Sequence, residues 1–310
     1  MSLESIINRK PSSAWERFCD SPLIFLAKLA YHLNGVRSPS NSPRSSGLHR
    51  VRIVCISDTH NQHVHLPVLP EGDVLIHSGD LTQSGTAEEV QSALEWLSRQ
   101  PHRHKIFIAG NHDTCLDNPD FIRSLPAKYP SLTYLQESSI VLHVRGRDIS
   151  FYGSPFTPRH GSWRFQYPRP PPGRRRPHED SQWFHIPDGT DVLITHGPPK
   201  CHLDMNNGCI DLLDALWRVK PKLHVFGHIH AARGTETLTW SNVQSSYEDI
   251  LSGCGGWKKL SSLLCSWLWM VVVETRRTPS CTIPVTLLVN ASSIGGFRDE
   301  TLHGAIVVDI

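Results

Sequence analysis

The sequence predicts an α/β protein in which helices pack over a β-sheet that contains parallel strands. Five apolar runs are each followed by a small residue or directly by Asp, Asn or His: VRIVCIS before Asp58, DVLIHSG before Asp80, HKIFIAG before Asn111, DVLIT before His196 and PKLHVFG before His228. Short β-branched and apolar runs of this kind are typical of buried strands. Helical segments lie between them, and this alternation indicates a sheet covered by helices.

Length and composition allow one large domain with extensions. The 310 residues can bury a full core, and the 39% hydrophobic and 19% charged residues are ordinary for a globular protein. The formal net charge of +2 lacks the strong basic excess of nucleic-acid-binding proteins, so no nucleic-acid polymer is expected as a partner. The composition does not distinguish a monomer from an oligomer.

Residues 1–50 are expected to form a short helix and a flexible linker, and a domain is expected over 51–310. The segment Pro22–Ala30 is apolar but short and is interrupted by Lys28, which favours an amphipathic helix over an anchor. Residues 34–49 are rich in Ser, Pro, Gly and Asn, which is typical of a linker.

Further elements are predicted in chain order after Val51. Thr86 and Glu89 have the spacing of a capping box and predict a helix through about Arg99. A second helix is predicted over Ile210–Val219, before Pro221. Additional strands are predicted at 140–144, 148–153, 235–240, 285–290 and 304–309, and residues 168–180, with Arg174–Arg176 at the tip, are predicted to form an exposed loop.

An apolar helical insert is expected at about 241–284. Its stretch Leu260–Val273 is too short to span a membrane and indicates a buried or interfacial helix, with peripheral membrane contact as the alternative. Within the insert, Leu260, Leu263, Leu264, Trp267, Leu268 and Val271 share one helical face. We hypothesise that the insert packs with Leu23–Leu33 as a helical cap beside the catalytic domain; alternatively, each segment covers a separate piece of the core.

The cysteines and the N-terminus indicate an intracellular, cytoplasmic protein. Eight cysteines occur without a CxxC pair or regular spacing, and MSLESIINRK lacks the layout of a secretory signal. No transmembrane span is expected.

Potential metal ligands collect after the five predicted strands. Because ligands gather beyond the carboxyl ends of parallel strands, we expect these side chains to converge: Asp58, His60, Asp80, Asn111, His112, His196, His228 and His230. Carboxylates, imidazoles and an amide suit divalent transition metals such as Mn, Fe, Zn or Ni. The absence of a thiolate in this set argues against a structural zinc site. Each motif taken alone also fits an ordinary turn or a structural histidine.

Taken together, the motifs follow the order D-x-H, G-D, G-N-H-[D/E], H and G-H-x-H. The chain therefore resembles the calcineurin-like metallophosphoesterases. GSPF (Gly153–Phe156), PDGTDVLITHGPP (Pro187–Pro199), KPKLHVFGHIH (Lys220–His230) and VNAS (Val289–Ser292) are similar to the small metallophosphoesterase-domain proteins of animals and fungi. The likeness covers about residues 51–240 and 285–310.

This resemblance implies a four-layer α-β-β-α sandwich with two mixed sheets and a binuclear metal centre. It implies that one metal is held by Asp58, His60 and His230, that the second is held by Asn111, His196 and His228, and that the Asp80 carboxylate bridges both. The implied cofactors are two divalent transition-metal ions, with Mn first and Fe, Zn or Ni as alternatives. A hydroxide activated by the metals would attack phosphorus.

The resemblance also implies that His112 faces the substrate and protonates the leaving group. The alternative for His112 is a hydrogen-bonding role behind the ligands. Asp113 fits a residue that orients a ligand or His112 from behind. Arg233 fits either a phosphate contact or a solvated surface residue.

The expected function is metal-dependent hydrolysis of a small or nucleotide-like phosphoester, with a diester favoured. Protein phosphatases of this superfamily carry a longer GDxxDRG motif, whereas Asp80 is followed here by LTQSG. The alternatives are a phospholigand-binding regulatory protein with little or no turnover, and a nuclease acting on DNA ends. Retention of both His228 and His230 favours the enzyme, and the absence of a basic excess disfavours the nuclease.

Overall fold

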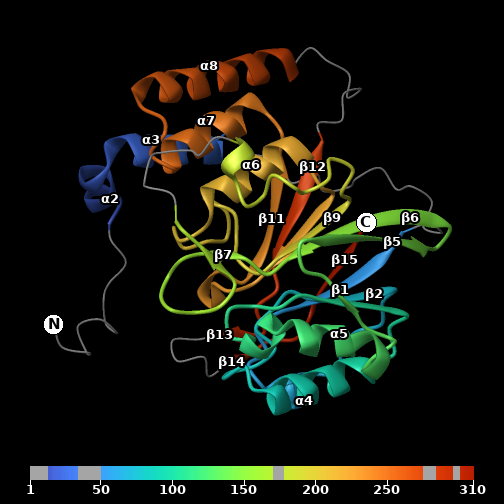
Figure 1. Cartoon of the computed structure of the whole chain (residues 1–310). Helices are drawn as coiled ribbons and strands as arrows, with labels where there is room; N and C mark the ends of the chain where they lie inside the picture. Colours follow the sequence, from blue (N-terminus) through green and yellow to red (C-terminus); the bar gives the residue numbers. More distant parts are fainter. Residues whose placement is uncertain (1–12, 34–49, 170–177, 275–283, 296–300) are drawn as a thin grey trace. The chain divides into compact units, whose positions relative to one another are not determined.

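A computed structural model describes residues 13–33, 50–169, 178–274, 284–295 and 301–310 (Figure 1). Their Cα positions group into two compact units. The described residues of Met1–Ser38 and Trp240–Ile283 form a helical unit. Those of Pro39–Thr239 and Pro284–Ile310 form an α/β unit, which contains every predicted ligand.

The first sheet of the α/β unit is built around three of the predicted motif-bearing strands. Its order is β15-β1-β2-β3-β4, in which only the edge strand β15 runs antiparallel to its neighbour. The strands are β1 (Arg52–Ile56), β2 (Val74–His77), β3 (His104–Phe107), β4 (Thr133–Tyr134) and β15 (Ile306–Asp309). All of β2 is buried, as expected for a parallel strand that is covered on both faces.

The second sheet contains the remaining two motif-bearing strands. Its order is β11-β12-β10-β9-β6-β5, with a parallel centre and an antiparallel strand at each edge. The strands are β5 (Ser138–Val144), β6 (Arg147–Ser154), β9 (Val192–Thr195), β10 (Leu223–Phe226), β11 (Gly234–Thr239) and β12 (Val285–Asn290). All the strands predicted from the sequence are therefore confirmed.

A single apolar core joins the two sheets face to face. It combines Ile53 and Ile76 of the first sheet with Phe151, Ile194 and Val225 of the second. On the outer face of the first sheet, a second cluster joins strand side chains to helices α4 (Ala87–Ser98) and α5 (Pro119–Lys128). Helix α6 (Ile210–Val219) lies on the side of the second sheet, and Figure 1 shows the helix, sheet, sheet and helix layers. The expected four-layer sandwich is confirmed.

Both predicted helices of this unit form. The Thr86 hydroxyl accepts a hydrogen bond from the Glu89 N–H at 3.2 Å and begins α4. The Glu89 carboxylate accepts from the Ser84 and Gly85 N–H groups, so it also fixes the loop before the helix. Helix α5, which the sequence analysis did not predict, begins after Asn118, whose side chain accepts from the Asp120 N–H.

Several short elements complete the α/β unit. They are β7 (Thr157–Pro158), β8 (Gln166–Tyr167), β13 (Ile294–Gly295), β14 (Thr301–Leu302) and the 3-10 helices η1 (His63–His65), η2 (Thr114–Asp117), η3 (His178–Asp180) and η4 (His230–Ala232). The predicted loop at 168–180 thus ends in a 3-10 turn. Its residues 170–177, with the three arginines, lie outside the described residues, as does the predicted linker.

The helical unit consists of α2 (Ala14–Asp20), α3 (Pro22–Leu33), α7 (Asn242–Leu251) and α8 (Trp257–Glu274). Ala27 of α3, Ile250 of α7 and Leu260 of α8 form its buried core. The Tyr31 ring stacks on the Tyr247 ring with centroids 4.0 Å apart. The hypothesis that the N-terminal helix and the insert pack against each other is confirmed.

Helix α8 is less buried than its apolar sequence indicates. Leu260 and Leu263 are buried, but Leu264 and Leu268 of the same expected face are exposed, as is Trp269. The apolar face is therefore exposed at Leu264 and Leu268, because α3 and α7 cover only one side of the helix. None of the helices in the described parts of the chain has the length and apolar character that crossing a membrane requires.

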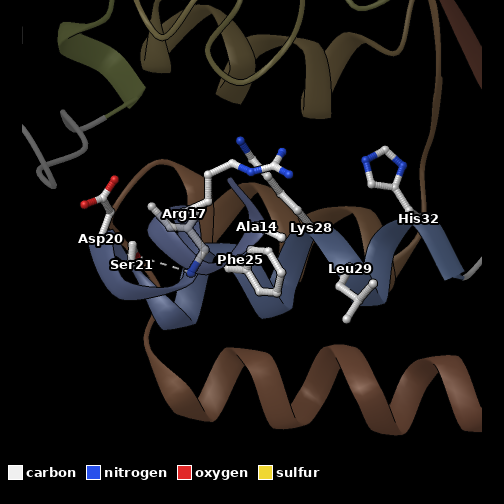
Figure 2. A pocket seen from close by; sticks show the side chains of 9 residues that line it. Ala14, Arg17, Asp20, Ser21, Phe25, Lys28, Leu29 and His32 are labelled. Carbon is white, nitrogen blue, oxygen red and sulfur yellow. Dashed lines mark hydrogen bonds between the residues drawn. The ribbon is translucent and has the colours of Figure 1, made fainter. Parts of the chain in front are cut away.

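A groove of about 470 Å³ lies on α2 and α3 of the helical unit. Figure 2 shows Arg17, Lys28 and His32 around it, with Phe25 and Leu29 as apolar lining. Arg17, Lys28 and His32 are exposed.

Candidate metal centre

The five motifs converge because their strands end at the same edge of the two facing sheets. Backbone hydrogen bonds join neighbouring motifs: the Asp58 N–H donates to the Gly79 carbonyl at 2.9 Å, and the Gly227 N–H donates to the His196 carbonyl at 2.9 Å. Asp58, Asp80 and His228 have positive φ angles of 50°, 51° and 67°. Residues held at positive φ in this way cluster at functional sites, where the surrounding structure maintains the strained backbone.

The first group of potential ligands is Asp58, His60 and His230. One donor atom from each lies within 4.8 Å of the other two. His230 Nε2 is 3.3 Å from Asp58 Oδ1, and the His60 and His230 ring centroids are 5.3 Å apart. The structure thus brings together the three residues that the resemblance assigns to one metal.

The second group contains Asp80, His196 and His228, whose donor atoms also lie within 4.8 Å of one another. His196 Nε2 is 3.2 Å from Asp80 Oδ2 and 3.0 Å from Asn111 Oδ1. His196 Nδ1 lies 3.1 Å from the Ser78 carbonyl oxygen, so Nδ1 carries the proton and Nε2 is aimed at the other donors.

Asp80 lies between the two groups. Its Oδ2 atom is 3.2 Å from His196 Nε2 and 3.7 Å from His60 Nε2. This position is the one that a carboxylate shared by two cations requires.

The protonation states of the cluster follow from burial and mutual charge. Burial alone would raise the pKa of the Asp80 carboxyl, but His196 outweighs it and holds this pKa well below its usual range. The pKa of Asp58 is lowered against burial in the same way, chiefly by its hydrogen bond with His230. Burial lowers the pKa of His228 to about 3.

His196 is the exception among these imidazoles. Burial would lower its pKa, but the charge of Asp80 outweighs burial and raises the pKa to about 9. A cation bound between His196 and Asp80 would take the place of this proton, since imidazole must be deprotonated to act as a ligand.

The residues present fit divalent cations. Both ring nitrogens of His60 are buried and have no hydrogen-bond partner within the described residues, although buried polar atoms are normally satisfied. A Cβ atom at Gly227 would come within 1.9 Å of Asp58 Oδ2, and one at Gly110 within 2.2 Å of Asp80 Oδ1. Only glycine leaves room for the two carboxylates, and the nitrogen and oxygen donors suit a first-row metal.

His112 is placed at the edge of the cluster. Its N–H donates to Asp80 Oδ1 at 2.8 Å, and its Nδ1 lies 2.7 Å from the Gln83 carbonyl oxygen. Nδ1 must therefore donate, which leaves Nε2 for other contacts. One donor atom of His112 also lies within 4.8 Å of donors of His60 and Asp80, so His112 is close enough to belong to a metal group as well.

Asp113 makes hydrogen bonds to two loops and does not orient one ligand side chain directly. Its carboxylate accepts from the Leu81 and Thr82 N–H groups at 3.2 and 2.9 Å, and from the Thr82 hydroxyl at 2.7 Å. It also accepts from the Gly110 N–H at 2.8 Å. The loop that carries Asp80 is thereby tied to the loop that carries Asn111 and His112.

Four further residues contribute to the site and were not assigned a role from the sequence. The Ser292 hydroxyl donates to Asp58 Oδ2 at 2.9 Å. Asn290 Oδ1 accepts from the Ser292 N–H at 3.2 Å, which fixes the turn that carries this serine. His160 and Trp163 place their rings 4.6 and 4.3 Å from the His228 and His112 rings, respectively. VNAS, which includes Asn290 and Ser292, was noted as a motif, but no local signal marks His160 or Trp163.

Arg233 has neither of the two roles considered for it. It is half-buried, and its guanidinium donates to the backbone carbonyls of Ser292 and Gly304 at 2.5 and 2.6 Å. It therefore braces the segments that carry Ser292 and the end of the chain.

A cavity of about 300 Å³ opens onto the cluster. Its lining consists of His60, Asp80, Gln83, Asn111, His112, His160, Trp163, His228, His230 and Ile294. Most of these side chains are polar, and Trp163 and Ile294 are the apolar ones.

Known proteins resemble this chain over different lengths. A protein of Emericella nidulans named probable rhamnogalacturonate lyase C is 41% identical over 317 residues, which cover 99% of this chain but 29% of that protein. Human metallophosphoesterase domain-containing protein 1 is 38% identical over 63% of this chain and 65% of that protein. A UPF0046 protein of Caenorhabditis elegans is 36% identical over 63% of this chain and 68% of that protein.

The chain thus spans less than two thirds of the first two of these relatives. A family model described as calcineurin-like phosphoesterase matches residues 51–232, a segment that includes all five motifs. Together with the two facing mixed sheets and the convergent donors at their edge, this match shows that the chain belongs to the calcineurin-like phosphoesterase family.

Proposed function

We propose that this protein is a phosphoester hydrolase that uses two divalent cations and acts on a small phosphodiester. The observation that carries the proposal is the shared position of Asp80 between two groups of buried and half-buried donors. Membership of a metal-dependent phosphoesterase family supports the general reaction. The alternative of a phospholigand-binding regulatory protein would use the same donors without efficient turnover.

In this proposal Asp58, His60 and His230 hold one cation. Asn111, His196 and His228 hold the other, and the Asp80 carboxylate contacts both. Two bound cations would acidify a water molecule and neutralise charge on the phosphoryl oxygens. Manganese is the first metal to test, followed by iron, zinc and nickel.

The remaining residues protonate the leaving oxygen or position the proposed metal ligands. As a general acid His112 would act in its doubly protonated form: Nδ1–H stays on the Gln83 carbonyl, and the proton on Nε2 goes to the leaving oxygen, which leaves a neutral imidazole. Asp113 keeps the loops of Asp80 and His112 at a constant separation through its four hydrogen bonds. Ser292 orients the Asp58 carboxylate.

The preference for a diester rests on the two residues that replace Asp and Arg of the GDxxDRG motif of protein phosphatases. Gln83 and Ser84 stand where that motif has Asp and Arg, and Gln83 lines the cavity. Ser84, which takes the place of the arginine, is neutral and supplies no positive charge to balance the second negative charge of a phosphomonoester.

The test is a screen of purified protein loaded with each metal in turn. Bis-p-nitrophenyl phosphate, p-nitrophenyl phosphate and cyclic nucleotides serve as substrates. We expect metal-dependent hydrolysis, faster for the diesters, with the Asp80→Asn variant as the inactive control. Saturable phosphate binding without turnover under every metal would instead support the regulatory alternative.

A further inference from the structure

We propose that the cavity selects phosphoesters whose organic group is a flat aromatic ring, and that this ring stacks on Trp163. This inference rests on the proposed function because it names the substrate class of the same site. Trp163 would determine specificity by binding the substrate without taking part in the chemistry.

Trp163 lies in a loop that is closed at its base. Between β7 and β8, the Thr157 N–H donates to the Phe165 carbonyl at 2.9 Å and the Arg159 N–H donates to the Tyr167 carbonyl at 2.8 Å. Phe165 is buried against the core of the first sheet. The loop tip is therefore carried by a rigid base.

A second tie lies beside the tryptophan itself. Arg164 pairs with Asp117 at 3.3 Å, and Asp117 belongs to the 3-10 helix that follows His112 and Asp113. The loop and the His112 segment are thus connected by an ion pair.

The indole is held in place but is not buried. Its ring centroid is 4.3 Å from that of His112, with a tilt of 31°, and Gly161 leaves space for it, since a Cβ there would lie 3.2 Å from Trp163 Cδ1. Even so, 45% of Trp163 is exposed, and the residue lines the cavity. A large aromatic side chain that has a neighbouring ring against one face and is otherwise accessible is a stacking platform.

A single side chain, His112, lies between Trp163 and the proposed ligand His60 in this series of ring contacts. The His112 ring centroid is 4.3 Å from that of Trp163 and 4.7 Å from that of His60. A ring attached through oxygen to a phosphorus over the donors would therefore lie alongside the indole. The cavity volume of about 300 Å³ is at the small end for ligand pockets, which suits a phosphoryl group with one ring system and not a polymer.

The test compares ligands that differ only in the flatness of the ring. Binding of phenylphosphonate and cyclohexylphosphonate to the manganese-loaded full chain is measured by calorimetry, and neither compound has an ester bond to hydrolyse. We expect phenylphosphonate to bind about 2- to 10-fold more tightly, as aromatic pairing predicts. Adenosine 5′-monophosphate and ribose 5-phosphate form a second pair, with about 5- to 100-fold expected if a nucleobase is the ring.

Variants assign the preference to Trp163. Trp163→Leu keeps apolar bulk and should bring both ratios to about one, whereas Trp163→Phe should keep part of the preference. Trp269→Ala, which removes an exposed tryptophan of the helical unit, is the matched control and should behave as the unmodified chain.

The outcomes separate this inference from the proposed function. A Trp163-dependent preference in either ligand pair supports the stacking platform, even if no substrate is turned over. Ratios of about one for both pairs in the unmodified chain overturn it, as does a preference that persists in Trp163→Leu. Hydrolysis of bis-p-nitrophenyl phosphate together with ratios of one would leave the proposed function standing and the platform wrong.

Discussion

Two cavities of this protein are lined by ionisable side chains, and they differ in how those side chains are held. In the cavity of the α/β unit, His60 and Asp80 are buried and lie close to each other, and Asp80 also contacts the buried His196. In the groove of the helical unit, Arg17 and Lys28 extend over the surface and are exposed (Figure 2). The second cavity is larger, at about 470 against 300 Å³.

The comparison shows that volume does not identify the site of chemistry. Burial of carboxylates and imidazoles costs desolvation free energy unless favourable interactions offset it, and a bound cation supplies such interactions. Exposed charges around a groove need no compensation because water solvates them.

Removal of the shared carboxylate should have the largest effect. Asp80→Asn keeps the size of the side chain but removes the charge between the two groups of donors. We expect metal content to fall from about two ions per chain and hydrolysis to fall to the assay background. Elemental analysis and initial rates measure both, with Asp20→Asn in the helical groove as the control. Two retained metals in Asp80→Asn would contradict the shared position.

Replacement of His112 should separate chemistry from metal binding. His112→Asn should leave metal content unchanged and lower turnover by about 10²–10⁴-fold, because the general acid is lost. The loss should be greatest for substrates with poor leaving groups, which a series of substituted phenyl diesters measures. If His112→Asn loses a metal ion, the residue is itself a ligand, as its proximity to His60 and Asp80 allows.

Replacement of Asp113 should have an intermediate effect. Asp113→Ala leaves the N–H groups of Leu81, Thr82 and Gly110 without their shared acceptor. The loop of Asp80 should then loosen, and metal affinity should fall by about 10- to 100-fold. Titration of the metal-free protein with manganese measures this. Unchanged affinity would show that the two loops keep their separation without this carboxylate.

Deletion of residues 1–45 should affect solubility more than catalysis. It removes α3, which covers Ile250, Leu260 and Tyr247 of the insert. The truncated protein should bind more hydrophobic dye and aggregate, while its soluble fraction keeps its activity because every proposed ligand lies in the α/β unit. A truncated protein that remains monodisperse and binds no more dye than the full chain would contradict this.

Loss of the basic groove should have the smallest effect. Arg17→Ala combined with Lys28→Ala removes two exposed charges from the helical unit. Activity and metal content should change by less than about twofold, since surface substitutions away from special features are usually neutral. A larger fall in activity would mean that the groove contributes to the reaction and that the contrast drawn above is wrong.

The sequence by itself determined the strands and the proposed ligands. An apolar run followed by a small residue and an Asp or His is a local pattern, and strand formation depends mainly on such local patterns. The order of the five motifs also indicates the family by itself, since each motif needs a particular residue type at a particular strand end.

Only the tertiary structure decided which distant residues support these ligands. Ser292 contacts Asp58 across 234 positions, and Trp163 reaches His112 from a loop whose sequence has no periodic pattern. The pairing of α3 with α8 likewise depends on which of several apolar faces meet, and Leu268 is exposed for that reason. Contacts of this kind arise from the packing of whole elements, so no short stretch of sequence encodes them.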